Sequence, residues 1–185
     1  MKRVERSELK DFETYREGRE TFRAHVLAQK EPRRIHVGNC LTFLFENPLT
    51  VRYQVQEMML TERIVKEADI LHELKTYNEL IPAQPGALGA TLLIEIESPQ
   101  ERDEKLSRWQ QLPKTLYAKL ADGTKVRPSF DERQISERRL SSVHYLTFDL
   151  QGQLPVALGC ELPDIAAEAT LSEAQRAALA ADLES

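Results

Sequence analysis

The sequence predicts an α+β fold in which a mostly antiparallel sheet carries several helices. Short runs of apolar residues are joined by turn signals such as Gly38-Asn39 and Asp122-Gly123, which is the pattern of antiparallel hairpins. Longer segments between these runs repeat their apolar residues at helical spacing. The chain has 185 residues and no convincing linker, so we expect residues 1–185 to form one domain.

The N-terminal half is expected to hold a hairpin between helices. Ser7 and Pro32 mark the start and end of the first helix, and Asn47 with Pro48 has the N-cap and first-position residues of a second. The expected segments are a helix over 8–30, strands over 33–37 and 41–46, and helices over 48–67 and 68–80.

The C-terminal half is richer in strands. Pro128 suggests that the strand containing it lies at a sheet edge, because proline has no N–H to donate. Residues 131–140 fit either a short helix or a loop. The expected segments are strands over 90–97, 115–120, 125–130, 142–150, 156–162 and 166–171, with helices over 99–111 and from Ser172 to near Leu183.

Composition narrows the class of protein. The net charge of −5 argues against a general nucleic-acid binder, which needs a basic surface. No apolar run approaches the roughly 18 residues of a membrane span, and the charged N-terminus does not resemble a secretory signal. We therefore expect a soluble cytoplasmic protein. In that reducing compartment Cys40 and Cys160 are expected to be free thiols, although the sequence does not say whether they meet.

Common signatures of enzymes are absent. The glycines form neither a dinucleotide-binding GxGxxG nor a phosphate-binding GxxxxGK[ST] pattern. The hydrolase pattern GxSxG and the zinc pattern HExxH are also missing. These absences remove the most easily recognised nucleotide, hydrolase and metalloprotease sites.

The predicted helix over 48–67 is the most informative segment. Apolar residues occupy more than half of its circumference, which indicates a substantially buried helix. Polar residues near the core then need partners. Three interpretations are open: a structural ion-pair network, a small-molecule or partner-binding groove lined by Arg52, Gln56 and Glu57, and a metal site.

The metal interpretation uses Glu57 or Glu62 with a histidine from elsewhere, since carboxylate and imidazole ligands suit iron, manganese or zinc. His144 lies on a predicted central strand, where it is either a core histidine with a satisfied hydrogen bond or a ligand. The ExxH pair of di-iron helix bundles is missing, which weakens this interpretation.

Four runs carry a family resemblance: LTFLFENPLTVRYQVQEMMLTERI, TYNELIP, ATLLIEIESPQER and SSVHYLTFDL. They are similar to the bacterial family catalogued as domain of unknown function 3501, over nearly the whole chain. The resemblance implies no established activity. It implies a genomic association with rubrerythrin-like and iron–sulfur reductase-like proteins, which points to redox or oxidative-stress physiology. His25 and His36 depart from the family pattern. The residues that match it are Glu46, Asn47, Arg52, Gln56, Glu57, Glu62, Arg63, Tyr77, Asn78, Pro82, Glu95 and His144.

Three hypotheses for function follow. The first is a cytoplasmic accessory or binding protein acting with a redox partner, either rubrerythrin-like or iron–sulfur reductase-like. The second is a metalloprotein that binds iron or another divalent ion. The third is a metal-free enzyme with a buried Glu57 or Glu62 as general base. The candidate binding residues are Arg52, Gln56, Glu57, Arg63, Tyr77 and Asn78, and the candidate metal ligands are Glu57, Glu62, Glu95 and His144.

Overall fold

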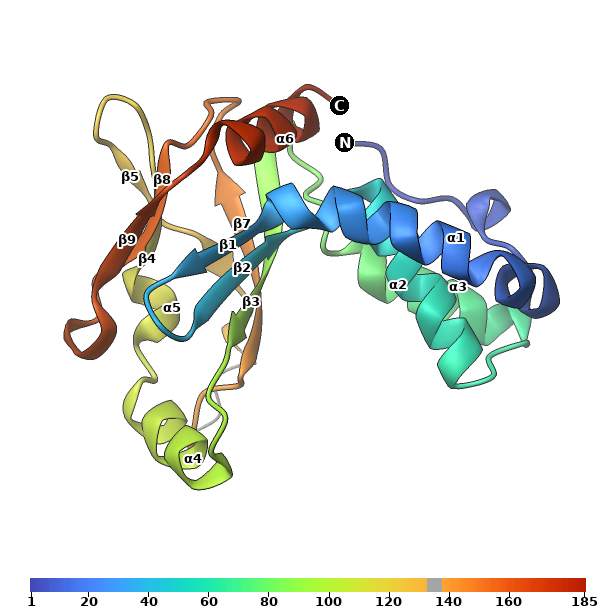
Figure 1. Cartoon of the computed structure of the whole chain (residues 1–185), viewed down its shortest axis with the longest axis horizontal. Helices are drawn as coiled ribbons and strands as arrows, with labels where there is room; N and C mark the ends of the chain where they lie inside the picture. The colour runs from blue at the N-terminus through green and yellow to red at the C-terminus, as the bar shows by residue number, and fades with distance from the viewer. Residues whose placement is uncertain (133–137) are drawn as a thin grey trace.

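The α+β prediction is confirmed, with the strands divided between two antiparallel sheets (Figure 1). The computed structural model describes residues 1–132 and 138–185. Sheet A has the strand order β1-β2-β3-β7-β6, and sheet B has the order β5-β4-β8-β9. The strands are β1 Arg34–Val37, β2 Leu41–Phe45, β3 Ala87–Ile94, β4 Leu116–Lys119, β5 Lys125–Val126, β6 Ser129–Phe130, β7 Val143–Asp149, β8 Ala157–Cys160 and β9 Ala167–Thr170.

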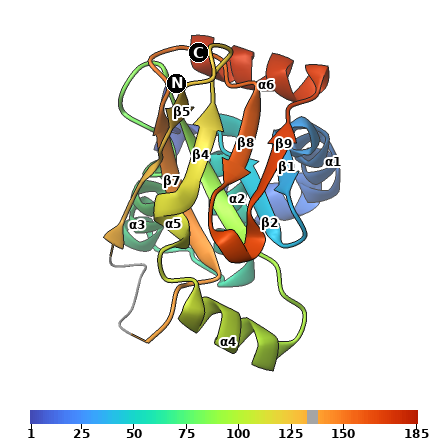
Figure 2. The ribbon, with the colours of Figure 1, turned by 90° about the vertical axis from the view of Figure 1, so that its left-hand side faces the viewer.

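The two sheets face each other, and sheet B lies in front of sheet A when the molecule is turned (Figure 2). Apolar side chains on the inner faces form one core, in which Phe43 of β2 and Phe148 of β7 pack with ring centroids 6.4 Å apart. Buried side chains from α4 (Pro99–Arg108), the short α5 (Leu112–Thr115) and α6 (Glu173–Glu184) complete this core.

A second apolar cluster holds the N-terminal helices together. It joins α2 (Pro48–Thr61) to α3 (Glu67–Asn78) and to the N-terminal segment, and α1 (Phe12–Lys30) also packs on α2. Figure 1 shows these helices to one side of the sheets. Val51, Val55 and Met59 of α2 are almost completely buried, as the apolar circumference of this helix predicts.

Several element boundaries differ from those predicted. The first helix begins after Asp11, whose side chain accepts from the Thr14 N–H, and not after Ser7. The second ends at Thr61 rather than near residue 67, because Arg63 adopts a left-handed backbone with φ of 55° that a helix cannot continue.

Other boundaries move by a few residues. The strand predicted over 90–97 runs over Ala87–Ile94, so Glu95 lies beyond its end, and the helix predicted over 99–111 ends at Arg108. The strand predicted over 125–130 divides at Pro128. Its first part, β5, pairs with β4 in sheet B, and its second part, β6, pairs with β7 in sheet A. Of the ambiguous segment 131–140, residues 133–137 lie outside the described residues.

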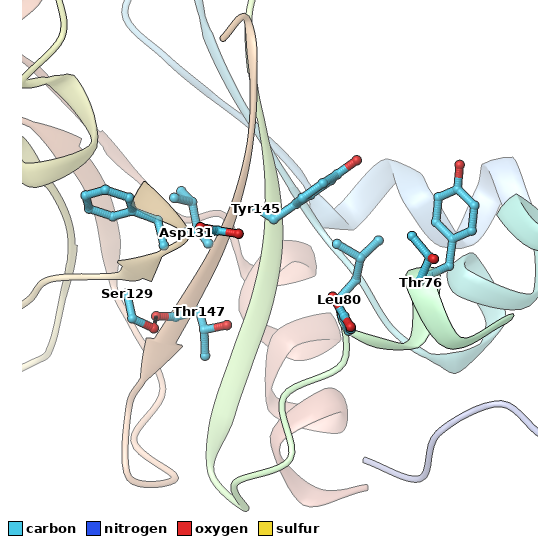
Figure 3. A pocket seen from close by; sticks show the side chains of 10 residues that line it. Thr76, Leu80, Ser129, Asp131, Tyr145 and Thr147 are labelled. Carbon is cyan, nitrogen blue, oxygen red and sulfur yellow. Dashed lines mark hydrogen bonds between the residues drawn. The ribbon is translucent and has the colours of Figure 1, made fainter. Parts of the chain in front are cut away.

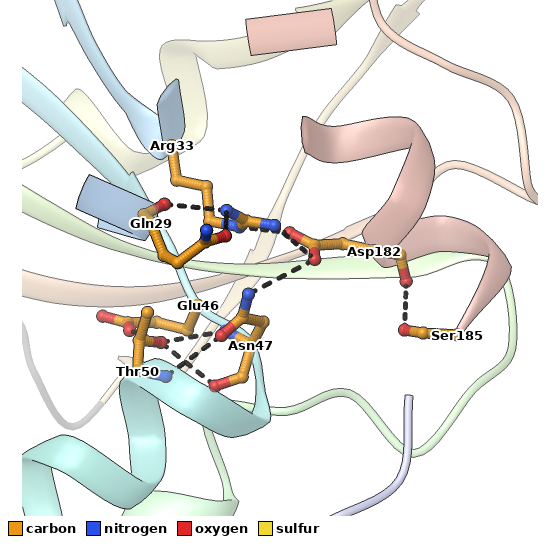
Figure 4. Close-up of polar contacts among 7 residues, drawn as sticks. All are labelled: Gln29, Arg33, Glu46, Asn47, Thr50, Asp182 and Ser185. Atoms are coloured by element: carbon orange, nitrogen blue, oxygen red, sulfur yellow. Dashed lines mark hydrogen bonds and ion pairs between the residues drawn. The ribbon is translucent and has the colours of Figure 1, made fainter. Parts of the chain in front are cut away.

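A buried polar network joins the helices to the sheets (Figure 4). Arg33, in the 3-10 turn after α1, donates to both carboxylate oxygens of Asp182 in α6, at 2.7 and 2.9 Å. The Asn47 side-chain amide, which caps α2, also donates to Asp182 at 3.4 Å. The neighbouring carboxylate of Glu46 accepts from the hydroxyls of Thr50 and Thr91. This network fixes the start of α2 relative to β3 and α6.

Candidate functional site

A cleft of about 320 Å³ lies between the C-terminal end of α3 and the outer face of sheet A at β6 and β7. Its volume is at the lower end of the range for small-ligand sites. The lining side chains come from two regions far apart in sequence. They are Thr76, Tyr77, Glu79 and Leu80 on the helical side, and Ser129, Phe130, Asp131, Tyr145, Leu146 and Thr147 on the sheet side.

The cleft depends on a close approach between the chain after α3 and strand β3. A Cβ at Gly89 of β3 would lie 1.9 Å from the backbone oxygen of Leu80. Only glycine therefore allows the segment after α3 to lie directly on the sheet. Gly89 pairs with Thr147 of β7, so this contact sets the helical wall beside the strand that carries the other wall.

Tyr145 is the most prominent aromatic side chain of the cleft. It is 46% exposed although it lies in the middle of β7. Figure 3 shows it projecting from the strand toward the side on which Leu80 and Thr76 lie. Burial raises the pKa of Tyr77, Gln54 opposes this by a hydrogen bond, and the charges of Glu73 and Tyr145 raise it further. Tyr77 and Tyr145 therefore line the same cleft, one from its helical side and the other from its sheet side.

The polar lining of the cleft is acidic and hydroxyl-rich. It includes the carboxylates of Glu79 and Asp131 and the hydroxyls of the lining threonine, serine and tyrosine residues. Among the lining residues that the structure describes there is no lysine, arginine or histidine. Such a lining complements a cation rather than an anion.

The predicted binding residues Tyr77 and Asn78 are adjacent but have different surroundings. Tyr77 lines the cleft. Asn78 is buried, and its side-chain amide exchanges two hydrogen bonds of 2.9 Å with the backbone of Val4. Asn78 therefore anchors the N-terminal segment against α3 and supports the position of its neighbour.

Arg52 and Gln56 line a separate cavity of about 140 Å³ between α1 and α2. The Gln56 side chain is buried and pairs with the backbone of Lys10, accepting at 2.6 Å and donating at 3.1 Å. The guanidinium carbon of Arg52 lies 5.1 Å from the centre of the Phe22 ring. These two residues are thus together, but they are in a different place from Tyr77.

Glu57 belongs to an ion-pair network between α1 and α2. Its oxygens accept two hydrogen bonds of 2.8 Å from Arg19 and one of 2.6 Å from the Tyr15 hydroxyl. Burial would raise the pKa of Glu57, but the hydrogen bonds and the charge of Arg19 hold it below its usual value. A general base at neutral pH needs the opposite shift, so this geometry fits the structural interpretation and not the catalytic one.

Glu62 and Arg63 lie at the exposed C-terminal end of α2. Arg63 borders a shallow hollow with Phe12, Arg16 and Val65. Glu62 makes none of the described hydrogen bonds or ion pairs through its side chain, so it offers neither a buried base nor a fixed ligand.

Glu95 and His144 occupy different environments. Glu95 is exposed and accepts a hydrogen bond from the Thr42 hydroxyl, which lies 2.8 Å from Nδ1 of His36.

His144 is completely buried, and its Nε2 lies 2.9 Å from the carbonyl oxygen of Ser141. Because a carbonyl only accepts, Nε2 carries the proton and Nδ1 has no hydrogen-bond partner in the described structure. Burial lowers the pKa of His144, with the Ser141 contact opposing it, which favours the neutral ring.

The four candidate metal ligands are not brought together. Glu57 is engaged by Arg19, Glu62 is on the helix end, Glu95 is beyond β3, and His144 is in the core. Within residues 1–132 and 138–185, no group of three or more His, Cys, Asp or Glu side chains could hold a metal ion. The donor set therefore does not fit the iron site considered from the sequence.

The two cysteines are not joined by a disulfide. Cys40 and Cys160 are both free thiols. Burial raises the pKa of Cys40, the charge of Lys105 opposes this, and the charge of Cys160 raises the pKa further.

The cleft contains residues that the sequence did not single out, notably Glu79, Phe130 and Tyr145. The alternation of β7 places Tyr145 on its wetter face with Val143, Thr147 and Asp149. An aromatic residue on this more exposed face of the strand is the sequence feature that could have identified Tyr145 as a site residue. The partner wall from α3 could not be inferred, because the sequence does not say which helix faces that strand.

Comparison with known proteins supports the architecture without supplying an activity. The chain is similar to a protein of unknown function from Burkholderia pseudomallei K96243, whose crystal structure matches with a TM-score of 0.88 and 31% sequence identity, covering 98% of this chain and 99% of that one. No functionally curated protein matched. In the described part of the chain, no helix has the length and apolar composition that a bilayer span requires. A family model described as "Protein of unknown function (DUF3501)" matches residues 3–183, and the chain therefore belongs to this family.

Proposed function

We propose that the protein is an accessory binding protein whose cleft between α3 and sheet A receives a cationic group. The observation that carries this proposal is the lining, in which Tyr77, Tyr145 and Glu79 meet in a cleft of about 320 Å³. An ammonium or guanidinium group is attracted to an aromatic ring face and to a carboxylate. The apolar side chains of Leu80 and Phe130 suit the alkyl stem that carries such a group.

Two sources could supply this cation: a free amine or guanidine, or a lysine or arginine side chain of a partner protein. The size of the cleft suits either one. The resemblance described above suggests rubrerythrin-like or iron–sulfur reductase-like proteins as partners. Either partner would insert one of its own lysine or arginine side chains beside Tyr145. The link to redox physiology rests on that association alone.

The other two hypotheses receive less support. A metal site lacks a convergent donor set among the described residues. The general-base hypothesis is not favoured at Glu57, because the pKa of this carboxyl is lowered. Binding in the cleft requires neither.

Isothermal titration calorimetry of the full chain with agmatine tests the proposal. We expect saturable binding that weakens at least fivefold in Glu79→Gln and about two- to thirtyfold in Tyr145→Ala, the range for loss of a cation–aromatic contact. Asp69→Asn is the matched control, because it removes one carboxylate from the exposed first turn of the same helix, far from the cleft. It should bind as the unmodified protein does.

A capped Gly-Arg-Gly peptide distinguishes the two sources. Tighter binding of the peptide than of agmatine indicates a partner side chain, and the reverse order indicates a free amine. Failure of both probes to bind, or equal binding to the Glu79→Gln variant, would overturn the proposal.

A further inference from the structure

We infer that the cavity between α1 and α2 is a second binding site, one that takes a small monocarboxylate. It measures about 140 Å³ and lies beside the apolar cluster that α2 shares with α3, since the side-chain amide of Gln56 in its lining is 3.9 Å from the sulfur of Met59 in that cluster. The residues that carry this inference are Lys10, Gly18, Phe22, Arg52 and Gln56. It is independent of the cleft and of the cation proposed to bind there.

Two cationic side chains line this cavity without a counter-ion in the described structure. Neither the Lys10 ammonium nor the Arg52 guanidinium is among the ion pairs of residues 1–132 and 138–185, although most neighbouring arginines are paired. The one carboxylate in the lining, Glu8, accepts at 2.7 Å from the backbone N–H of Glu5 as part of a capping box. The side chains of the lining therefore have a net charge of +1, which suits an anion.

The backbone of Lys10 and the side chain of Arg52 each have a described contact beside the cavity. Gln56 is 2% exposed, and its side-chain amide accepts a hydrogen bond from the Lys10 N–H and donates one to the Lys10 carbonyl oxygen. The guanidinium of Arg52 lies over the ring of Phe22, and its N–H groups have no acceptor among the described hydrogen bonds. A carboxylate is the acceptor that such a planar donor matches best.

Gly18 keeps the cavity open. Glycine in the interior of a helix is unfavourable, and Gly18 has an ordinary helical backbone that does not require it. A Cβ at this position would meet only Nζ of Lys10, at 3.9 Å, so packing does not require glycine either. What its missing side chain provides is space beside Lys10, within the cavity.

The volume and the rings limit the size of the ligand. A cavity of about 140 Å³ holds roughly five non-hydrogen atoms at about 30 Å³ for each water-sized group. The aromatic rings of Phe22 and Tyr15 supply apolar contact for a short carbon chain. A carboxylate of two to four carbons meets both limits, with its charged end toward Arg52 and Lys10.

Amide chemical shifts of the ¹⁵N-labelled full chain, titrated with sodium propionate, test this inference. We expect saturable shifts centred on residues 8–22 and 52–56. Propionamide, which has the same shape without the charge, and inorganic phosphate, which has charge without a carbon chain, should each bind at least tenfold more weakly. Equal binding of propionamide, or a preference for phosphate, would overturn the assignment.

Variants separate binding from folding. Lys10→Gln alters an exposed side chain, and Arg52→Gln removes the second cation; each should weaken propionate binding at least fivefold. Gly18→Ala should raise the melting temperature and yet weaken binding, a combination that general damage to the fold would not produce. Lys75→Gln, on the exposed face of α3, is the matched control and should bind normally. Unchanged affinity in both Lys10→Gln and Gly18→Ala would contradict the site.

Discussion

Replacing Asp182 by asparagine should strongly destabilise the protein, because it leaves a buried arginine without its counter-ion. The side chains of Arg33 and Asp182 are only 6% and 7% exposed, and their contact is bidentate. Asparagine preserves the size of the side chain but offers one acceptor oxygen and no charge. The guanidinium of Arg33 would then keep its contacts with Gln29, of which the one to the carbonyl oxygen measures 2.7 Å, and would have one neutral acceptor at position 182 in place of two charged ones.

The expected magnitude follows from this burial. Removing one partner of a buried ion pair costs about 3–5 kcal/mol, because the remaining charge stays desolvated. For a chain of this size that corresponds to a fall in melting temperature of roughly 6–20 °C. Replacing both partners together, as in Arg33→Met with Asp182→Leu, removes both desolvated charges and should cost much less, about 0–2 kcal/mol.

Urea unfolding, followed by circular dichroism and by fluorescence of the buried Trp109, measures these free energies. The reasoning would be refuted if Asp182→Asn cost less than about 1 kcal/mol. It would also be refuted if the double variant were less stable than the single one, since the penalty would then arise from lost packing and not from an unpaired charge.

Three further predictions concern the core and the packing of the helices. Since burial lowers the folded-state pKa of His144 below 6.5, the unfolded chain binds an extra proton as the pH falls from 7 to 5. Burying the neutral ring therefore has no protonation cost well above pH 6.5. Below that pH the free energy of unfolding falls by up to about 1.4 kcal/mol per pH unit. Urea unfolding at pH 7, 6 and 5 should therefore show a flatter pH dependence in His144→Leu, and an unchanged slope would contradict this. Glu57→Gln breaks a partly exposed pair with Arg19 and should cost about 1–2 kcal/mol in the same assay at pH 7; no measurable cost would argue against a structural role. Gly89→Ala should lower the yield of folded protein or the melting temperature sharply, because its Cβ would meet the Leu80 backbone; a fully stable variant would show that this close approach is dispensable.

Local signals in the sequence identified much of the fold. Asn47 and Pro48 begin α2 as their residue types predict, with the Asn47 side chain accepting from the Thr50 N–H. The Gly38-Asn39 turn connects β1 and β2 in antiparallel register. Both features depend on residues adjacent in the chain. The division at Pro128 could not be predicted, because it depends on which distant strand each half pairs with.

The candidate site was predicted only in part, for the same physical reason. Periodicity indicated that some polar residues of the second helix lie near the core; Gln56 is buried and Glu57 is partly buried, whereas Glu62 is exposed. Their partners come from the N-terminal part of the chain: Glu57 accepts from Arg19 of α1, and Gln56 pairs with the backbone of Lys10, which precedes α1. Periodicity along one helix does not identify the neighbouring helix. Tyr77 was singled out, but the opposite wall with Tyr145 depends on tertiary packing across more than sixty residues.

The most direct test of the central claim is the location of a bound cation. Amide chemical shifts of the ¹⁵N-labelled full chain should be followed during titration with agmatine. The account predicts saturable shifts concentrated in residues 76–80, 129–131 and 145–147, which line the cleft. Shifts centred on another surface, or none at agmatine concentrations in the millimolar range, would contradict a cation-binding cleft between α3 and sheet A.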